Sequence, residues 1–238
     1  MRVEIWSDVV CPWCYIGKRR FETALAAFPH RAEVEVVWRA FELDPAAPQE
    51  RLGKYAVMLA DKYGFPVEQG QEMIDTMTAA AAQDGLDFHF ETARVGNTFD
   101  AHRLLHLAHE RDLQDALKER LLRATFCEGE PIGDHATLVR LAAEAGLDAD
   151  DASAVLASDR YAEQVHSDEQ QARDYGISGV PFFVVDGKLG VSGAQPADVL
   201  RQLLDQAWEQ SRPLQLLNAS GVSDTAAAPG CDGDSCRL

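Results

Sequence analysis

Two cysteines near the start of the chain have the spacing of a redox-active dithiol. Cys11 and Cys14 are separated by Pro12 and Trp13, and an apolar stripe at helical spacing follows them. Proline suits the first position of a helix, where no backbone N–H is needed, so Cys11 is expected at the helix N-terminus. Free N–H groups and the helix dipole there stabilise a thiolate, the form of cysteine that attacks disulfides. This spacing predicts Cys11 as the nucleophile and Cys14 as the resolving thiol.

A second pair of cysteines, Cys231 and Cys236, lies near the end of the chain. Its short spacer contains glycine, so the pair can close a local disulfide. We interpret it as a second redox pair that exchanges electrons with the first, and its neighbouring aspartates should raise the thiol pKa and leave Cys11 the more reactive. An incidental pair, or a zinc site formed by both pairs, is the alternative. Cys127 follows an apolar helical pattern and is assigned no role.

Pro181 opens an apolar run that indicates a strand, and Val180 precedes it. Because proline removes one hydrogen-bond donor from a strand, the backbone of Val180 is left free to pair with an extended peptide. An X–Pro bond also adopts the cis form at low cost. Taken alone, Pro181 is more simply interpreted as an edge-strand proline without a role.

One acidic residue and three histidines could also serve the dithiol. Asp8 lies three residues before Cys11, where it can relay a proton or cap the helix, and capping is the commoner role. His102, His106 and His109 share one helix face, which we assign to packing. No metal site is predicted, because no carboxylate lies nearby at ligand spacing.

The elements that must position these residues put strands at both ends of the chain and helices between them. A strand over 3–6, the dithiol helix and a strand over 34–38 make a βαβ unit with parallel strands. Asp186-Gly187 predicts a hairpin between strands over 180–185 and 188–191. Helical spacing predicts the helices 50–63, 67–84, 97–111, 113–127, 134–145, 150–157, 160–175 and 197–208. The pattern indicates one α/β domain interrupted by an all-helical insertion.

Composition excludes several classes of partner. The chain has 22 Lys and Arg against 39 Asp and Glu, a net charge of −17, which argues against nucleic acid and anionic membranes. Its longest apolar run, Tyr55 to Ala60, is far shorter than the roughly 20 residues of a membrane helix. No apolar signal core precedes Cys11, so a cytoplasmic location is expected, where this spacing indicates redox or metal chemistry.

Together the motifs resemble the thioredoxin superfamily and, within it, the FrnE-like branch of the DsbA family. The similarity covers nearly the whole chain up to about residue 212. It is carried by Ser7-Asp8-Val9-Val10-Cys11-Pro12-Trp13-Cys14, Asn97-Thr98 with Ala101-His102-Arg103-Leu104, and Gly179-Val180-Pro181-Phe182-Phe183 with Ser192-Gly193-Ala194-Gln195. The resemblance implies a thiol-disulfide oxidoreductase or isomerase with no organic cofactor. It also implies that Pro181 is cis and packs against the Cys11–Cys14 disulfide, and it extends to the C-terminal C-x4-C pair.

The implied site has a catalytic core and a rim. Cys11, Cys14 and Pro181 are the expected catalytic residues. The expected substrate-binding residues are Pro12, Trp13, Val180, Asn97 and His102, and Tyr15 and Phe182 with Trp13 should form an apolar rim around the sulfur. Partners are then protein thiols and disulfides together with a thiol reductant or oxidant.

Two departures from the family pattern leave alternatives open. Typical DsbA proteins are exported and have Pro-His between the cysteines, whereas this chain has Pro-Trp, so we expect a less oxidising potential. The fold also resembles kappa-class glutathione transferases and 2-hydroxychromene-2-carboxylate isomerases, which makes glutathione chemistry the alternative, although those enzymes typically have serine where Cys11 stands. A module of another class would use its paired cysteines to hold zinc or bind a partner without redox turnover.

The expected organisation has three parts. Residues 1–44 and 166–212 form the thioredoxin-like domain, residues 45–165 the helical insertion, and residues 213–238 a flexible tail with the second cysteine pair. The apolar insertion could also carry a homodimer surface.

Overall fold

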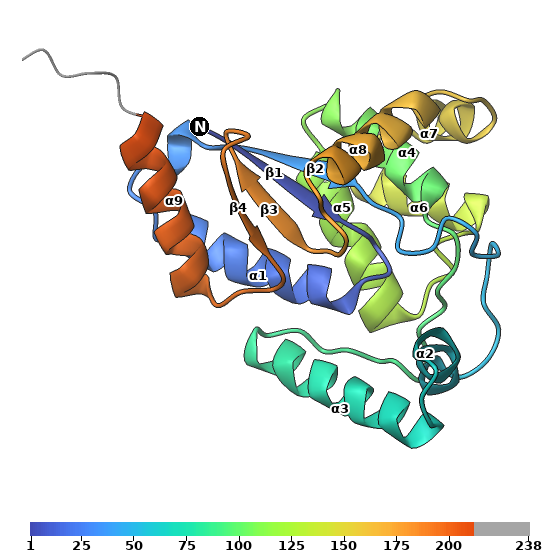
Figure 1. The fold of residues 1–238 in the computed structure, drawn as a ribbon. Coiled ribbons are helices and arrows are strands. Elements are labelled where there is room, and N and C mark those ends of the chain that lie inside the picture. Colours follow the sequence, from blue (N-terminus) through green and yellow to red (C-terminus); the bar gives the residue numbers. More distant parts are fainter. Residues whose placement is uncertain (212–238) are drawn as a thin grey trace, which may run out of the picture.

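A four-stranded sheet lies at the centre of the computed structural model, which describes residues 1–211 (Figure 1). The strand order is β2-β1-β3-β4; β1 runs parallel to β2, and β3 runs antiparallel to β1 and β4. The strands are β1 (Arg2–Ser7), β2 (Glu35–Ala40), β3 (Phe182–Val185) and β4 (Leu189–Ser192). The predicted parallel pair and hairpin are both present, and Asp186 and Gly187 make the turn with positive φ angles.

Helices cover both faces of the sheet because its central strands are apolar on both sides. Val3 and Ile5 of β1 pack with residues of α1 (Pro12–Ala26) and α9 (Ala197–Ser211). On the opposite face, Trp6 packs with Ala172 of α8 (Ala162–Asp174). This arrangement places the start of α1 at the carboxyl end of β1, where the dithiol lies.

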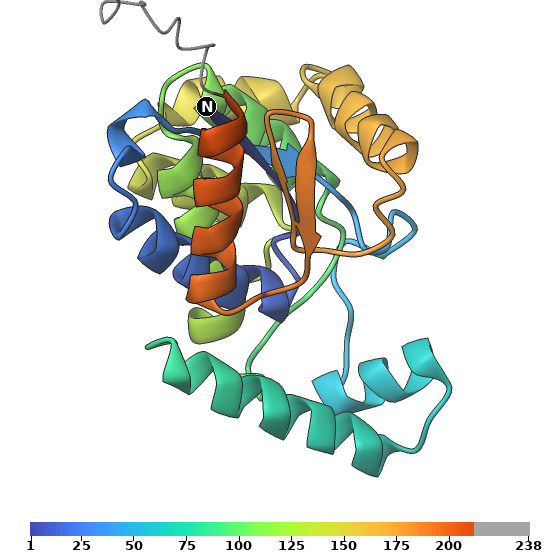
Figure 2. The same cartoon turned by 60° about the vertical axis from the view of Figure 1, so that its left-hand side comes forward.

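The helices between β2 and α8 form two groups that both pack against the sheet domain. Helices α4 to α7 share an apolar core that includes Val9, which precedes the dithiol. Helices α2 and α3 lie apart from them below α1 in both views (Figures 1 and 2), and their core includes Tyr15 and Ile16 of α1. These helices are α2 (Tyr55–Tyr63), α3 (Val67–Gln83), α4 (Phe99–His109), α5 (Gln114–Arg123), α6 (His135–Glu144) and α7 (Ala149–Leu156), with a π-helical turn over Ala124–Glu128 after α5 and a 3₁₀ turn over Arg31–Glu33 before β2.

A glutamine side chain from the insertion closes the outer edge of β2. Gln114 accepts a hydrogen bond from the backbone N–H of Trp38 at 2.9 Å and donates one to the carbonyl of the same residue at 2.9 Å. The Asp168 carboxylate of α8 accepts from the N–H of Ala40 at 2.9 Å. The edge strand therefore has side-chain partners where a further strand could otherwise pair.

The helix predicted over 50–63 begins only at Tyr55. The residues before it form a loop whose backbone is tied to the segment ahead of α4. Arg51 donates its N–H to the carbonyl of Val95 at 2.8 Å, and Asn97 donates to Pro48 at 2.8 Å. These bonds between distant segments satisfy the loop backbone in place of helical ones.

Within residues 1–211, no helix is long and apolar enough to cross a membrane. The tail pair, Cys231 and Cys236, lies outside the described residues.

Candidate dithiol site

Cys11 occupies the N-cap of α1 and Pro12 the first helical position, as the sequence predicts. The Cys11 N–H donates to the carbonyl of Asp8 at 3.3 Å, and the Cys14 N–H donates to the carbonyl of Cys11 at 3.0 Å. Both thiols are free. Cys11 retains 5% of its surface and Cys14 none, so of the two residues only Cys11 offers surface to a partner.

The loop before β3 lies directly against the dithiol helix. The peptide bond between Val180 and Pro181 is cis. The Cys11 thiol donates to the carbonyl of Val180 with a sulfur–oxygen distance of 3.5 Å. The ring of Pro181 packs on Gly17 of α1, where an added Cβ would lie 2.8 Å from the Pro181 Cγ. Within residues 1–211 the Val180 N–H donates to no protein acceptor, so it is available to a ligand.

The two thiols share one ionisation. The proton shared with Cys14, together with burial, raises the pKa of Cys11. Burial opposes ionisation of Cys14 as well, but the interaction with Cys11, the Lys118 ammonium and the nearby Ser7 hydroxyl outweigh it and lower its pKa. We therefore expect the pair to lose its first proton easily and its second with difficulty. The Lys118 ammonium and the proton shared by the two sulfurs thus ease the first ionisation of the pair.

Lys118 is the cation beneath the dithiol, and the sequence alone does not identify it. It comes from α5 and is fully buried; its Nζ donates to the carbonyl of Ser7 at 3.1 Å and lies 5.5 Å from the centre of the Trp38 ring. Burial lowers the pKa of Lys118 to about 8, although the charges of Cys14 and Asp8 oppose that shift. A buried ammonium at this place favours negative charge on the neighbouring sulfur.

Asp8 does not cap α1, which corrects the role that the sequence favours. Its carboxylate accepts from the N–H of Leu43 at 2.8 Å, and its other oxygen lies 3.4 Å from Nε2 of His102. Burial opposes its ionisation, yet His102 and Leu43 outweigh burial, and the pKa of Asp8 is lowered. Asp8 thus joins α4 and the loop after β2 to the base of the site, and the N-cap position of α1 belongs to Cys11, whose side chain makes no capping hydrogen bond.

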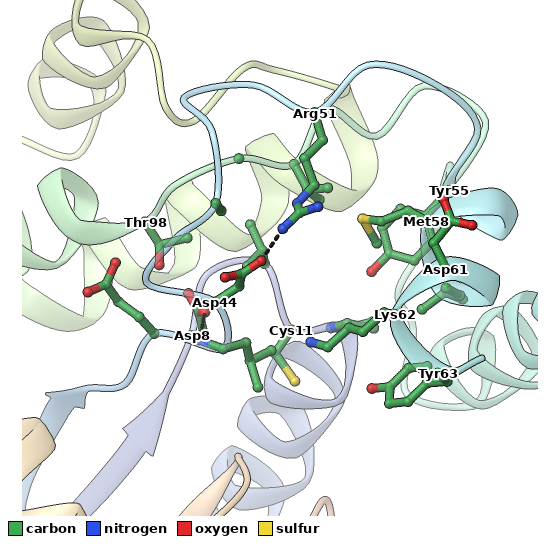
Figure 3. Close-up of a pocket in the computed structure, with 18 of the residues that line it drawn as sticks. Asp8, Cys11, Asp44, Arg51, Tyr55, Met58, Asp61, Lys62, Tyr63 and Thr98 are labelled. Atoms are coloured by element: carbon green, nitrogen blue, oxygen red, sulfur yellow. Dashed lines mark hydrogen bonds and ion pairs between the residues drawn. The ribbon is translucent and has the colours of Figure 1, made fainter.

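A cavity of about 1170 Å³ opens beside Cys11 (Figure 3). Its walls come from the first turn of α1, the loop after β2, helices α2 and α3, and residues 178–180. Glu42 lines it with a buried, unpaired oxygen, and burial together with the charge of Glu169 raises the pKa of Glu42 to about 7. The cavity is large enough for a peptide segment or a small thiol.

The structure brings together part of the predicted rim. Pro12, Trp13 and Val180 line the cavity beside Cys11. The other proposed rim residues lie elsewhere: His102 is buried behind Asp8, Asn97 accepts from the N–H of Phe99 at the start of α4, Tyr15 stacks on Phe88 in the core, and Phe182 packs beside the cluster around Trp6.

The remaining candidates lie outside the dithiol site. His106 lies 3.1 Å from the Asp168 carboxylate and stacks on Tyr161, which agrees with the packing role that we assign to it. His109 is exposed at the end of α4. Cys127 packs at the margin of the cluster that joins α1 to α3, where burial raises its pKa.

Comparison with known proteins gives a consistent result across the chain. A family model described as the DSBA-like thioredoxin domain matches residues 2–205. The crystal structure of a probable DsbA oxidoreductase from Streptomyces coelicolor is 50% identical, with a TM-score of 0.85, and the match covers 97% of this chain and 100% of that chain. The uncharacterized protein YwbO of Bacillus subtilis is 29% identical over 208 residues, which cover 86% of this chain and 96% of YwbO.

More distant structures share the fold alone. The cytosolic disulfide reductase DsbM from Pseudomonas aeruginosa, in a structure with GSH, is 17% identical with a TM-score of 0.63, and the match covers 88% of this chain and 100% of that one. A 2-hydroxychromene-2-carboxylate isomerase is 12% identical with a TM-score of 0.60, and the match covers 88% and 97% of the two chains.

Proposed function

Because the chain belongs to the family of DSBA-like thioredoxin domains, we propose that it exchanges thiols and disulfides with protein substrates through Cys11 and Cys14. The observation that carries this proposal is the position of Cys11. The residue lies at the N-terminus of α1, retains the exposure that Cys14 lacks and lines the cavity, and its sulfur contacts the carbonyl of Val180.

In the reductive direction, the Cys11 thiolate attacks one sulfur of a substrate disulfide, and the other substrate sulfur leaves as a thiolate. This attack requires the proton shared by the pair to lie on Cys14. The Cys14 thiolate then attacks the Cys11 sulfur and releases the second substrate thiolate, so two electrons and two protons pass from the enzyme to the substrate. Lys118 supports the step in which Cys14 carries charge, and in the reverse direction it stabilises Cys14 as the leaving group.

The rim supports a peptide as the substrate. The Val180 N–H has no protein acceptor among residues 1–211 and lies beside the reacting sulfur, so it can donate to an extended backbone. Pro12 and Trp13 add apolar surface on the other side of the sulfur. A peptide backbone held there would bring its cysteine to Cys11.

Glutathione chemistry is the second candidate, and the cavity is the observation that favours it. About 1170 Å³ next to Cys11 exceeds what a single cysteine side chain needs. A solved structure of DsbM contains GSH, and this observation concerns DsbM alone. Retention of both thiols at the site favours disulfide exchange over glutathione transfer in this chain.

Three finer parts of the proposal rest on the sequence. Cys231 and Cys236 would exchange electrons with the first pair, and a cytoplasmic enzyme with Pro-Trp between its cysteines would be less oxidising than exported DsbA proteins. A homodimer through the helical insertion stays a prediction.

The test is the reduction of insulin by dithiothreitol, with the full chain and its variants. We expect the parent to accelerate the reaction, Cys11→Ser to lose the acceleration, and Cys127→Ser, the matched thiol outside the site, to keep it. Loss of activity in Cys231→Ser/Cys236→Ser as well would make the tail a working second redox pair. A parent without activity on insulin that reduces a glutathione mixed disulfide would favour the second candidate.

A further inference from the structure

Buried polar atoms without a hydrogen-bond partner gather at the base of the Cys11 cavity. Within residues 1–211 they include one oxygen of Asp8, one oxygen of Glu42 and Nε2 of His102. Asp8 and His102 face each other across 3.4 Å, and the second Asp8 oxygen accepts from the N–H of Leu43, the residue after Glu42. Glu42 is therefore the group here whose side chain has no partner at all. Buried polar groups in native proteins are almost always paired, so this one needs an explanation.

The surroundings of Glu42 contain negative charge and no cation that offsets it. Glu42 retains 8% of its surface, and its N–H donates to a carboxylate oxygen of Glu169 at 3.3 Å. Burial and the carboxylates of Glu169, Asp8, Asp100 and Asp44 raise the pKa of Glu42 to about 7. Within the described residues no Lys, Arg or His forms an ion pair with it. A cation from outside the chain would supply the charge balance that the fold leaves out.

The charged residues of the cavity are separated by wall. Asp8, Glu42 and Asp44 come from the segments that follow β1 and β2, and the lysines come from the N-cap and the last turn of α2. Figure 3 shows Asp8 and Asp44 on one side of Cys11 and Lys62 on the other. The charged lining residues are the carboxylates Asp8, Glu42, Asp44, Glu50 and Asp61 and the cations Arg51, Lys54 and Lys62. The excess is negative, and it lies on the wall that holds Glu42.

This wall suits a side chain with an apolar stem and a positive tip. Phe41 and Leu43 line the cavity with Glu42, and Arg51 already neutralises Asp44. Lysine and arginine lay their stems along apolar surface and carry their charge at the end. No group of three His, Cys, Asp or Glu side chains in residues 1–211 could hold a metal ion. An organic cation with one carboxylate partner therefore fits the wall better than a metal does.

We propose that Glu42 is a specificity residue that binds the ammonium or guanidinium group of a Lys or Arg side chain close to the cysteine of a client protein. The stem of that side chain would lie on Phe41 and Leu43, while the client cysteine meets Cys11. This inference rests on the proposed function and adds a substrate preference to it.

Peptides that differ in one charged group test the preference. Each contains one cysteine, held as a mixed disulfide with a chromophoric aromatic thiol, and one variable residue at one of the four positions within two residues of it. The variable residue is lysine or norleucine, which has the same four-carbon stem without the ammonium group. The protein is the full chain with Cys231→Ser/Cys236→Ser, reduced and freed of dithiothreitol. The measurements are made at pH 8, where Glu42 is mostly ionised, and at physiological salt.

The reaction releases a coloured thiolate that reports the first step. Cys11 attacks the peptide sulfur and the aromatic thiolate leaves; Cys14 then attacks the Cys11 sulfur and the peptide thiolate leaves. The dithiol becomes a disulfide, and its two electrons and two protons pass to the two released thiols. The rate at limiting substrate concentration therefore compares how well each peptide reaches Cys11.

We expect the lysine peptide to react about tenfold faster than its norleucine counterpart at the best of the four positions, because a charge-assisted hydrogen bond in a buried setting is strong. In Glu42→Gln this ratio should fall close to one, since the amide offers no charge. Glu68→Gln makes the same change at an exposed position of α3 and should keep the ratio of the parent. It controls for the general attraction of a cationic peptide to a chain of net charge −17.

A ratio near one in the parent at all four positions would overturn the cation site while leaving the dithiol function intact. The same holds for a preference that survives in Glu42→Gln or that falls equally in Glu68→Gln, because the net charge and not Glu42 would then be responsible. If the parent reacts with the norleucine peptides no faster than Cys11→Ser does, the proposed function itself fails, and the cation site fails with it.

Discussion

At the scale of single residues, the reactivity of the dithiol depends on charges that come from elsewhere in the chain. Cys14 has no solvent access, so water cannot stabilise its thiolate. The Lys118 ammonium from α5 stabilises the thiolate instead. The Asp8 carboxylate beside it is held in place by His102 and Leu43. Removing one member should therefore change the ionisation of the pair.

Lys118→Met should raise the lower pKa of the dithiol by about one unit, because the cation that lowers the pKa of Cys14 is lost. Thiolate absorbance against pH, in a background of Cys127→Ser/Cys231→Ser/Cys236→Ser, measures this pKa. Lys18→Met is the matched control, since Lys18 is equally buried but pairs with Glu22, Asp115 and Glu119. The same titration curve in parent and Lys118→Met would contradict the role of this residue.

Glu42 should make stability depend on pH. Its pKa is raised from 4.5 to about 7 in the folded protein, so the folded state binds more protons than the unfolded state between these values. The resulting stabilisation is present below about pH 4.5 and is lost as the pH rises through about 7, a decrease of about 2–3 kcal/mol in the free energy of unfolding. Urea titrations from pH 5 to pH 8 measure it.

Glu42→Gln should flatten that part of the stability profile, because the amide does not ionise. Glu68→Gln, a change of an exposed carboxylate on α3, is the control and should leave the profile as in the parent. A profile in Glu42→Gln that declines as steeply as in the parent would show that another group is responsible.

The sequence predicts which residues react but not the residues that set their ionisation. The environment of Cys11 is local, because proline favours the first position of a helix and so places the preceding cysteine at the N-cap. Lys118 acts through a contact with Ser7, more than a hundred residues away along the chain, so no local pattern reveals its partner. One signal was available: Lys118 shares a helix face with Gln114, Leu121 and Leu122, where a lysine is out of place unless it is paired.

At the scale of elements, the contact between α1 and the loop before β3 holds Pro181 against the dithiol helix. Gly17→Ala should destabilise the protein by about 1–3 kcal/mol, because the new Cβ would lie 2.8 Å from the Pro181 ring. Alanine favours a helix over glycine by only about 1 kcal/mol, which is too little to offset the clash. The reaction of Cys11 with insulin should slow as Val180 moves away.

Thermal unfolding and insulin reduction measure these two effects, with Thr23→Ala as the control on an exposed position of the same helix. A Gly17→Ala protein as stable and as active as the parent would mean that the loop shifts freely without affecting the site.

The elements themselves could largely be predicted, since apolar periodicity is a local property of the chain. Each helix of the structure overlaps a predicted one, and the two strand pairs have the predicted directions. The residues before Tyr55 are the exception, because their backbone bonds to residues 95–97, and such pairings depend on the tertiary path. The same dependence on the tertiary path explains why Asn97 was predicted in the wrong place. The resemblance puts it in the cleft, whereas in the structure its side chain accepts a hydrogen bond at the start of α4.

At the scale of the whole molecule, the insertion and the sheet domain should unfold together. The core of α4 to α7 includes Val9, and the core of α2 and α3 includes Tyr15 and Ile16, so neither part buries its apolar surface alone. The four tryptophans, Trp6, Trp13, Trp38 and Trp208, all lie in the sheet domain, whereas most helical residues lie in the insertion. Fluorescence and far-ultraviolet circular dichroism therefore report on different parts.

We expect the two signals to give the same urea midpoint for the full chain. Separate midpoints would show that the insertion is an independent folding unit, and the shared cores would then contribute little to the cooperativity of unfolding. Val9→Ala, which opens a cavity in the shared core of α4 to α7, should lower both midpoints together.

The contact between Lys118 and Ser7 also has a consequence for the chain during its synthesis. Domains fold as the chain leaves the ribosome, from the N-terminus onward. Cys11 and Cys14 emerge about a hundred residues before Lys118, so the nascent chain exposes the dithiol before its buried cation exists. The pair acquires its eased first ionisation only when α5 docks, so until then the two cysteines of the nascent chain attack disulfides at the slower rate of ordinary thiols.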